Sequence, residues 1–141
     1  MPPKSSSNYR RTKDQWDELT HAGLAFLEEQ ARMQRTTTYT EMNSVLEQRT
    51  SAKAFDFAHD RERAAMGRLL CHIVESNRPT SGLMISAIVI YLNENDAGGG
   101  FYRLAGSYGL LPSAADADAR LVFWSGEVAK VHDYYRPTPR R

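Results

Sequence analysis

Leu83-Met-Ile-Ser-Ala-Ile-Val-Ile-Tyr-Leu92 is the one ten-residue apolar run of this chain, and the other predicted elements are arranged around it. A helical pattern precedes it, and the triple glycine Gly98 to Gly100 follows and leads directly into Phe101. A short apolar run between turn signals, with apolar residues on both faces, is typical of a buried strand. The order therefore predicts a helix, a buried strand over 83–92, a glycine turn and another helix.

The N-terminal part of the chain predicts a long helix. Thr12-Lys-Asp-Gln15 matches the capping-box pattern, so we expect the helix to begin here. Apolar residues then recur at helical spacing to about Arg35, with Trp16 and Phe26 among them. This apolar face could close the core of the domain, or it could form the seam of a homodimer.

A second, shorter helix is expected after a turn. The β-branched stretch 36–39 suggests an extended entry, and Thr40 can cap a helix that ends near Arg49. The segment that follows has no clear period, and we interpret it as a loop pinned by Phe55 and Phe57.

Residues 60–77 predict a third helix, with Asp60 as its cap and Arg78-Pro79 marking its end. One face of this helix is apolar, and its members are Met66, Leu69, Leu70, Ile73 and Val74. Polar side chains occupy the opposite face, so the third helix should lie against the core on one side only.

Two further helices are expected, over 101–110 and over 118–135. The last helix should face the core with Leu121, Trp124, Val128 and Val131. The whole pattern predicts a mainly helical α+β fold with a small sheet, around which the first and last helices pack.

The length of 141 residues is typical of one domain. We expect this domain to span 12–135, between a disordered basic tail at 1–11 and a second basic tail at 136–141. Residues 1–13 carry four basic residues and no acid, whereas 14–135 carry 11 basic and 17 acidic residues, a net charge of −6. A basic tail can attract nucleic acid or can be a solvated end, so the charge leaves both readings open.

Several site types are not expected in this sequence. The only cysteine, Cys71, lies among apolar residues of the third helix, which excludes an internal disulfide and a cysteine-rich zinc site. Four scattered histidines lack the i, i+4 spacing of a helical metal site, so we expect no metal and no cofactor. The apolar run is too short to span a bilayer as a helix, and the N-terminus lacks the apolar core of a signal peptide. A cytoplasmic protein without membrane contact is therefore expected.

Four motifs occur in an order that resembles the C-terminal winged-helix domain of the O6-alkylguanine-DNA alkyltransferases and their alkyltransferase-like relatives. They are Thr38-Tyr39-Thr40-Glu41, Arg63-Ala-Ala-Met-Gly67, the strand Met84 to Ile90, and Gly-Gly-Phe-Tyr opening the next helix. The family reads Thr-Tyr-Gly-Glu, Arg-Ala-Val-Gly and Pro-Cys-His-Arg-Val-Val, then a glycine turn and helix. The resemblance covers roughly 36–111 and implies a winged-helix or helix-turn-helix centre that binds DNA.

The chemistry of that family is absent from the sequence. Its Pro-Cys-His-Arg becomes Ile85-Ser-Ala-Ile88, so the nucleophile, the histidine base and the arginine are all missing. A serine without an adjacent base is not an activated nucleophile. Aligning Gly67 with the family's glycine also places Ala64 where the family has its base-displacing arginine, with Arg63 one position away. The resemblance therefore implies a binding scaffold without alkyl transfer, and we find no other catalytic set.

A second resemblance, over about 39–135, is to short uncharacterised proteins of actinobacteria and their phages. The shared segments are the strand-like Ile85 to Ile90, the glycine-to-helix segment Gly98 to Ala105, and Phe123 to Glu127 near the C-terminus. This resemblance implies a small regulatory protein of phage or actinobacterial origin but indicates no activity.

In a winged helix the third predicted helix would be the recognition helix and would enter a DNA major groove. Its polar face, the preceding loop and the start of the second helix then give the candidate contacts, which are Tyr39, Arg49, Lys53, Arg61, Arg63, Arg68 and His72. Residues 49–78 carry six basic and four acidic residues, a net charge of +2. The alternative is a solvated face on which acidic neighbours partly cancel the charge.

A protein-interaction module is the competing hypothesis, for example a phage factor that binds and inhibits a host protein. The net acidic body favours it, because a negative domain repels phosphate. Tyr134, Tyr135 and Arg136 are the candidate partner surface. The backbone amides of Gly98 to Gly100 could hold an anion at a helix N-terminus, but a tight turn that lets Phe101 pack inward is the better explanation of the glycines.

Overall fold

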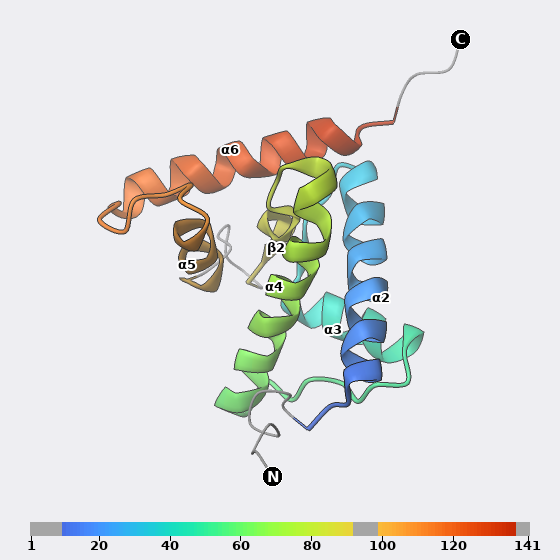
Figure 1. Ribbon diagram of the computed structural model, residues 1–141. Helices are drawn as coiled ribbons and strands as arrows, with labels where there is room; N and C mark the ends of the chain where they lie inside the picture. Colours follow the sequence, from blue (N-terminus) through green and yellow to red (C-terminus); the bar gives the residue numbers. More distant parts are fainter. Residues whose placement is uncertain (1–9, 92–98, 138–141) are drawn as a thin grey trace.

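The structure is a computed structural model that describes residues 10–91 and 99–137 (Figure 1). Within these ranges the chain is mainly helical with a small sheet, as the sequence predicts. In chain order the elements are α2 (Lys13–Arg32), β1 (Thr37–Thr38), α3 (Tyr39–Arg49), α4 (Asp60–Ser81), the 3-10 helix η1 (Ile85–Ile88), β2 (Val89–Ile90), α5 (Gly99–Ser107) and α6 (Ala117–Tyr135).

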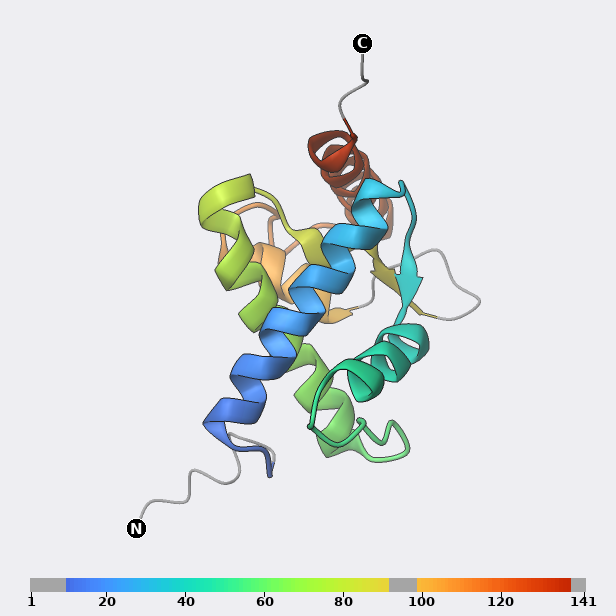
Figure 2. The same cartoon turned by 90° about the vertical axis from the view of Figure 1, so that its right-hand side faces the viewer.

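Two long helices, α2 and α4, form the centre of the molecule and cross each other (Figures 1 and 2). α6 lies across one end of this pair, and α5 lies beneath the N-terminal half of α6. α3 lies near the opposite end of the pair, beside α2 (Figure 2). η1 contacts α2, α4 and α6, so the apolar run is enclosed by helices.

The contact between α2 and α4 depends on a glycine. A Cβ atom placed on Gly23 would lie 2.7 Å from Cδ1 of Ile73 and 3.2 Å from Cε of Met42. Trp16 and Phe26 on α2 are buried in the same core, so this face closes the domain and is not available as a homodimer seam.

The predicted strand over 83–92 is wrong for most of its length. Its middle part, Ile85–Ile88, forms η1, only Val89 and Ile90 are in a strand, and Leu92 lies outside the described residues. Side chains of α6 bond the backbone of this segment: the Glu127 carboxylate accepts the N–H of Met84 at 2.9 Å, and Trp124 Nε1 donates to the carbonyl of Ala87 at 2.8 Å. Since buried backbone groups need partners, these two side chains supply what neighbouring strands would otherwise provide.

The small sheet joins the segment before α3 to the end of the apolar run. β1 and β2 pair in parallel, with Thr37 opposite Val89 and Thr38 opposite Ile90. Parallel strands need a long crossover connection, which α3, α4 and η1 supply here. The register places the residues that follow the two strands, Tyr39 and Tyr91, next to each other.

Two helix caps differ from the sequence prediction. The cap of α3 is Thr38 instead of Thr40, and its hydroxyl accepts the N–H of Glu41 at 3.0 Å. The N-cap of α4 is His59, which makes no side-chain capping bond, and Asp60 is the first helical residue, where its charge suits the helix dipole.

The C-terminal end of α4 was predicted too early. The helix continues through Pro79 to Ser81 and ends at Gly82, whose φ of 73° is left-handed. The N–H of Gly82 bonds the carbonyl of Arg78 at 2.8 Å, as in the usual glycine-terminated helix. The position of this glycine, and not the proline, therefore ends the helix.

The first helix begins as expected, because Thr12 and Gln15 form the complete capping box. Arg11, which the prediction places in the disordered tail, is 4% exposed and packs on the ring of Phe55 at 4.2 Å. The ring of Phe55 stacks on that of Phe57, so the loop between α3 and α4 is pinned as predicted. Tail residues 1–9 and 138–141 lie outside the described residues.

The last two helices are each shifted slightly from their predicted bounds. α5 starts at Gly99, and α6 is capped by the Asp116 side chain, which accepts the N–H of Ala119. The predicted inner stripe of α6 is wrong at Leu121, which is 43% exposed, whereas Glu127 is buried beside Val131. None of the helices in the described ranges combines the length and apolar character of a membrane span.

Candidate functional site

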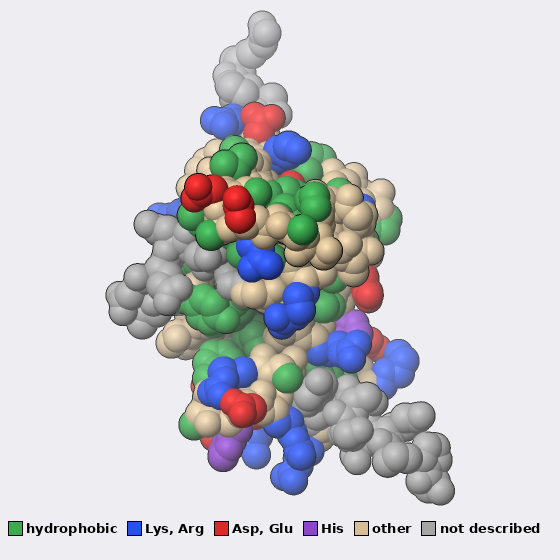
Figure 3. Space-filling view, turned by 90° about the vertical axis from the view of Figure 1, so that its left-hand side faces the viewer, with side chains coloured by type: hydrophobic (Ala, Val, Ile, Leu, Met, Phe, Trp, Pro, Cys, Tyr) green, Lys and Arg blue, Asp and Glu red, His purple; other side chains and the backbone are tan. Residues whose placement is uncertain are grey.

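A groove with a volume of about 990 Å³ lies between α4 and α5. Lys and Arg side chains gather on this face of the molecule around exposed apolar groups (Figure 3). The residues that line the groove are Tyr39, Thr40, Phe57, Arg63, Ala64, Met66, Gly67, Arg68, Leu70, Cys71, Ser86, Tyr91, Gly100, Phe101, Arg103, Leu104 and Ser107.

α4 forms one wall of the groove. Its apolar stripe packs against the core, so the other side of the helix is exposed. The two small residues Ala64 and Gly67 lie on the groove side, and a Cβ atom on Gly67 would meet nothing within 4 Å. Arg63 and Arg68 flank them and are both exposed. The wall is therefore open at its centre and basic at its edges.

α5 forms the opposite wall. Tyr102 and Ala105 bury one side of this short helix, which leaves Arg103 exposed on the side that lines the groove. The Arg103 guanidinium lies beside the start of its own helix, so that a Cβ atom on Gly99 would be 3.3 Å from Nη1. The glycines therefore leave room for a cation at this helix end. Gly98, the first residue of the predicted anion site, lies outside the described residues.

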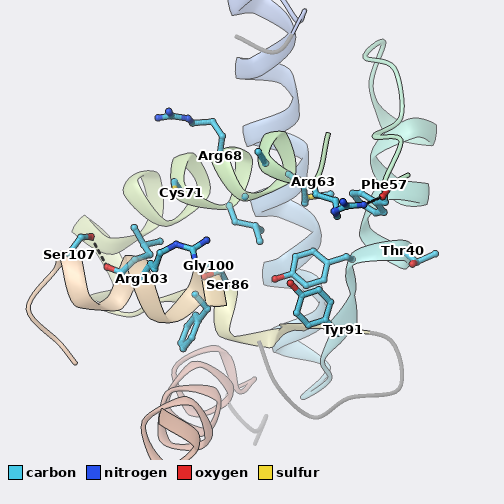
Figure 4. A pocket seen from close by; sticks show the side chains of 17 residues that line it. Thr40, Phe57, Arg63, Arg68, Cys71, Ser86, Tyr91, Gly100, Arg103 and Ser107 are labelled. Atoms are coloured by element: carbon cyan, nitrogen blue, oxygen red, sulfur yellow. Dashed lines mark hydrogen bonds between the residues drawn. The ribbon is translucent and has the colours of Figure 1, made fainter. Parts of the chain in front are cut away.

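One end of the groove is aromatic. The rings of Tyr39 and Tyr91 are 4.9 Å apart at their centroids and tilted by 37°. Phe57 lines the same end next to Arg63, whereas Arg103 and Ser107 lie at the other end (Figure 4). Apolar ring surface and cationic groups thus share one concave site.

The electrostatic character of the groove is positive. Among its described lining residues are three arginines and no acidic side chain. Arg63 is partly neutralised, because it bonds the Asp60 carboxylate and the carbonyl of Phe57. Arg68 and Arg103 form no ion pair within the described part of the chain, so both charges are available to an anion.

The thiol of Cys71 lines the groove, and its side chain is half-buried. Burial raises the pKa of this thiol above its ordinary value, with the charge of Arg68 acting in the opposite direction. Burial therefore favours the neutral thiol, which is a poor nucleophile.

The structure brings three of the predicted contact residues together. Tyr39, Arg63 and Arg68 all line the groove. Arg61 lies outside it but is exposed on α4 seven residues before Arg68, and residues seven apart lie on the same side of a helix.

The other predicted DNA contacts lie elsewhere. Arg49 is held by Glu29, with both guanidinium-to-carboxylate distances at 3.0 Å. Lys53 is exposed in the loop before α4, and His72 packs edge-on against the ring of Trp16 in a second, smaller hollow. These three residues do not form a common surface with the groove.

The predicted partner surface at the C-terminal end is smaller than expected. Tyr134 is 48% exposed, and Arg136 is exposed near Asp133. Tyr135, however, is turned inward, where its hydroxyl accepts from Asn77 Nδ2 at 2.8 Å and donates to Glu28 Oε2 at 2.9 Å. It therefore holds α6 against the central helices.

Comparisons with known protein families, curated proteins and solved structures gave no match. The resemblances to the alkyltransferases and to the actinobacterial proteins consequently remain expectations from the sequence. A proposal for the function therefore has to be argued from the basic and aromatic side chains that line the groove.

Sequence reasoning missed Phe57, Tyr91 and Arg103 as site residues. A helical spacing, Gly100, Arg103, Leu104 and Ser107, does indicate one common face of α5. No pattern in the sequence shows that this face meets α4, because that contact depends on how α5 packs beneath α6.

Proposed function

We propose that this protein binds nucleic acid through the groove between α4 and α5. The observation that supports the proposal is the lining, which joins three arginines to aromatic rings, among them the exposed Tyr91, without an acidic side chain among the described residues. Arginine suits phosphate because its planar guanidinium can donate two parallel hydrogen bonds. Aromatic rings suit bases because they offer a stacking surface.

The basic surface continues beyond the groove along α4. Arg61 and Arg68 are seven residues apart on the same side, which corresponds to about 10 Å along the helix axis. A phosphate backbone that follows α4 would therefore pass from Arg68 to Arg61, with Arg63 beside it.

The net charge of −6 over residues 14–135 does not oppose this proposal. Charges separated by more than about 10 Å are largely screened at physiological salt, so a ligand responds mainly to the groups around its own site. Acidic residues such as Glu29 and Glu62 are held in ion pairs outside the groove.

The resemblance to the winged-helix proteins implies the same helix as the binding element. In that mode α4 would be the recognition helix, and Arg61, Arg63 and Arg68 would contact the DNA. The groove adds α5 and Arg103 to this set. The protein would act as a small binding protein. By occupying a stretch of nucleic acid it would regulate the access of other proteins to that stretch.

The test is the salt dependence of binding for a double variant, Arg68→Ala with Arg103→Ala. Neither side chain forms an ion pair in the described structure, so the fold should tolerate their loss. Fluorescence anisotropy with labelled oligonucleotides, duplex and single-stranded, would be measured between low and physiological salt. Removing two phosphate contacts should weaken binding at every salt concentration and reduce the slope of log K against log salt by about 2.

The matched control is Arg32→Ala with Lys130→Ala, which removes the same charge from two exposed positions outside the groove. This control should leave the salt slope unchanged. If the wild-type protein shows no salt-sensitive binding to either oligonucleotide at low ionic strength, the proposal is wrong. Equal losses in the groove variant and the control would show attraction by net charge and would also reject the groove.

Protein binding is the second candidate, and the outer face of α6 favours it. Leu121 is 43% exposed and Val122 is 74% exposed on this helix. A double change to Ser at these positions should abolish capture of a partner by this face while leaving nucleic-acid binding intact. Size-exclusion chromatography of wild type and variant, alone and with candidate partners, would separate the two functions.

A further inference from the structure

We infer that the groove takes a single-stranded nucleic acid, with a base stacked at the Tyr39–Tyr91 end and phosphates held by Arg63, Arg68 and Arg103. This inference rests on the proposed function, since it specifies which form of nucleic acid the groove accepts. Three features of the structure lead to it: the position of the tyrosine pair, the exposure of Tyr91, and the separation of the arginines.

The sheet positions the tyrosine pair. β1 and β2 are parallel, with Thr38 opposite Ile90, so the next residue of each strand extends the same register. These residues are Tyr39 and Tyr91, whose ring centroids are 4.9 Å apart. Because Tyr39 is also the first residue of α3, a helix start and a sheet register together hold one ring of the pair.

Tyr91 leaves ring surface uncovered. It is 46% exposed although it lines the groove, whereas Tyr39 is half-buried against the core. A large ring supported on one side by another aromatic ring and open to a concave basic site is a suitable platform for a base. Phe57, stacked on the buried Phe55, adds a second supported ring at the same end.

The arginines define a path for the phosphates. Arg63 lies near the aromatic end and Arg103 near the opposite end, and the guanidinium of Arg103 is directed toward the middle of the groove (Figure 4). Arg68 extends from α4 on the side that faces away from α5 in this view, so it lies at the rim of the groove (Figure 4). Cations at both ends and at the rim fit a strand that runs through the groove better than a single isolated phosphate.

A duplex cannot use the aromatic rings of this groove. In a double helix the base faces are stacked on one another, so a protein meets only base edges and the backbone. A single strand exposes its base faces, and aromatic rings bind them with little sequence preference. The rings of the groove therefore contribute only to binding of a single strand.

The experiment compares three labelled ligands at one salt concentration by fluorescence anisotropy. They are a 12-nucleotide single strand of mixed sequence, the duplex of the same sequence, and a 12-unit abasic strand that has the phosphates but lacks the bases. The wild-type protein should bind the single strand at least tenfold more tightly than either of the others.

The variant Tyr91→Ala tests the stacking platform itself. Loss of one stacked base should weaken single-strand binding roughly 5- to 150-fold, and it should leave abasic-strand binding unchanged. Tyr91→Phe keeps the ring and should bind normally. Tyr134→Ala is the matched control, because Tyr134 is 48% exposed but lies at the far end of α6, and it should have no effect.

Equal binding of the single strand and the duplex, or of the single strand and the abasic strand, would overturn this inference. Binding that remains salt-dependent and sensitive to Arg68 and Arg103 would still support the proposed function in that case. The ligand comparison uses wild-type protein alone, so it stays decisive even if Tyr91→Ala fails to fold.

Discussion

The guanidinium of Arg11 donates two hydrogen bonds to the carboxylate of Glu62, with Nη1 3.1 Å from Oε2 and Nη2 3.0 Å from Oε1. This pair joins the residue before the cap of α2 to the first turn of α4, across 51 positions of sequence. Nη2 also donates to the carbonyl of Lys53 at 3.2 Å. One arginine thereby fixes the start of α2, the loop before α4 and the start of α4 itself.

Replacing Glu62 by Gln should lower the free energy of unfolding by about 3 kcal/mol, because the buried Arg11 charge loses its counter-ion. The exposed bidentate pair of Arg49 and Glu29 is the matched control, and Glu29→Gln should cost less than about 1 kcal/mol. Urea denaturation at pH 7 measures both values. Equal costs for the two variants would contradict a special role for burial.

The same pair predicts acid sensitivity. The hydrogen bonds from Arg11 hold the pKa of Glu62 below its ordinary value. A carboxyl whose pKa is lower in the folded state stabilises the fold above its unfolded pKa, near 4.3, and this contribution is lost as the pH falls through the folded value. Stability measured between pH 7 and pH 3 should fall below about pH 4.5, and Glu62→Gln should flatten that fall. An unchanged profile in the variant would exclude Glu62 as a source of the acid sensitivity.

Removing the hydroxyl of Tyr135 should destabilise the junction of α6 with α2 and α4. The variant Tyr135→Phe leaves Asn77 and Glu28 without their shared partner, at a cost of about 1–3 kcal/mol. Tyr134→Phe is the control, since its hydroxyl makes one long contact of 3.4 Å to the carbonyl of Thr80, and its melting temperature should stay near that of wild type.

Tyr135 should also ionise at a higher pH than a free phenol. Burial, opposed by the hydrogen bond from Asn77, raises its pKa to about 12. Because the unfolded phenol ionises near pH 10, the folded state should lose stability between about pH 10 and pH 12. Ultraviolet titration of wild type and Tyr135→Phe should differ by one phenol that ionises late, and identical curves would contradict the assignment.

Two helical glycines should respond oppositely to alanine. Gly126 has open space around its Cα in the middle of α6, so Gly126→Ala should stabilise the protein by about 1 kcal/mol through helix propensity. At Gly23 the new methyl group would crowd Ile73 and Met42, and the overpacking should cancel or exceed that gain. Thermal melts of both variants test this, and an equal rise in melting temperature would show that α2 and α4 can separate without cost.

Arg103 is one of the site residues that the sequence did not indicate, and its single replacement tests the groove most directly. Arg103→Ala should reduce the salt slope of nucleic-acid binding by about 1, whereas Lys130→Ala should not change it. Arg103→Lys keeps the charge and loses the planar donor geometry, so it should restore the slope but only part of the affinity. A normal slope in Arg103→Ala would remove α5 from the binding site.

Local signals in the sequence account for much of the helical framework. The capping box at Thr12 and the helical spacing of apolar residues in α4 and α6 place three helices within a few residues of their observed bounds. These signals act between residues three or four positions apart, so they can be read without knowledge of the rest of the chain.

The apolar run from 83 to 92 shows the limit of such reading. Its composition correctly predicted burial for the middle of the run, since every residue from Met84 to Val89 is buried, whereas Tyr91 is exposed. Its backbone conformation depended on Glu127 and Trp124, about 40 residues away, whose side chains bond the backbone of η1. An apolar run carries no directional information about its hydrogen bonds, so a strand and a 3-10 helix look alike in sequence.

The candidate site also has a part that the sequence could predict and a part that depended on tertiary packing. The sequence by itself determined that Arg61 and Arg68 lie on the outer face of a helix whose other face is buried, and that a glycine turn leads into a further helix. Only the tertiary structure decided that Arg103 faces that helix across a groove, and that Tyr39 and Tyr91 meet at its end. The first result follows from helical periodicity, whereas the second depends on the packing of α5 beneath α6 and on the parallel register of two short strands.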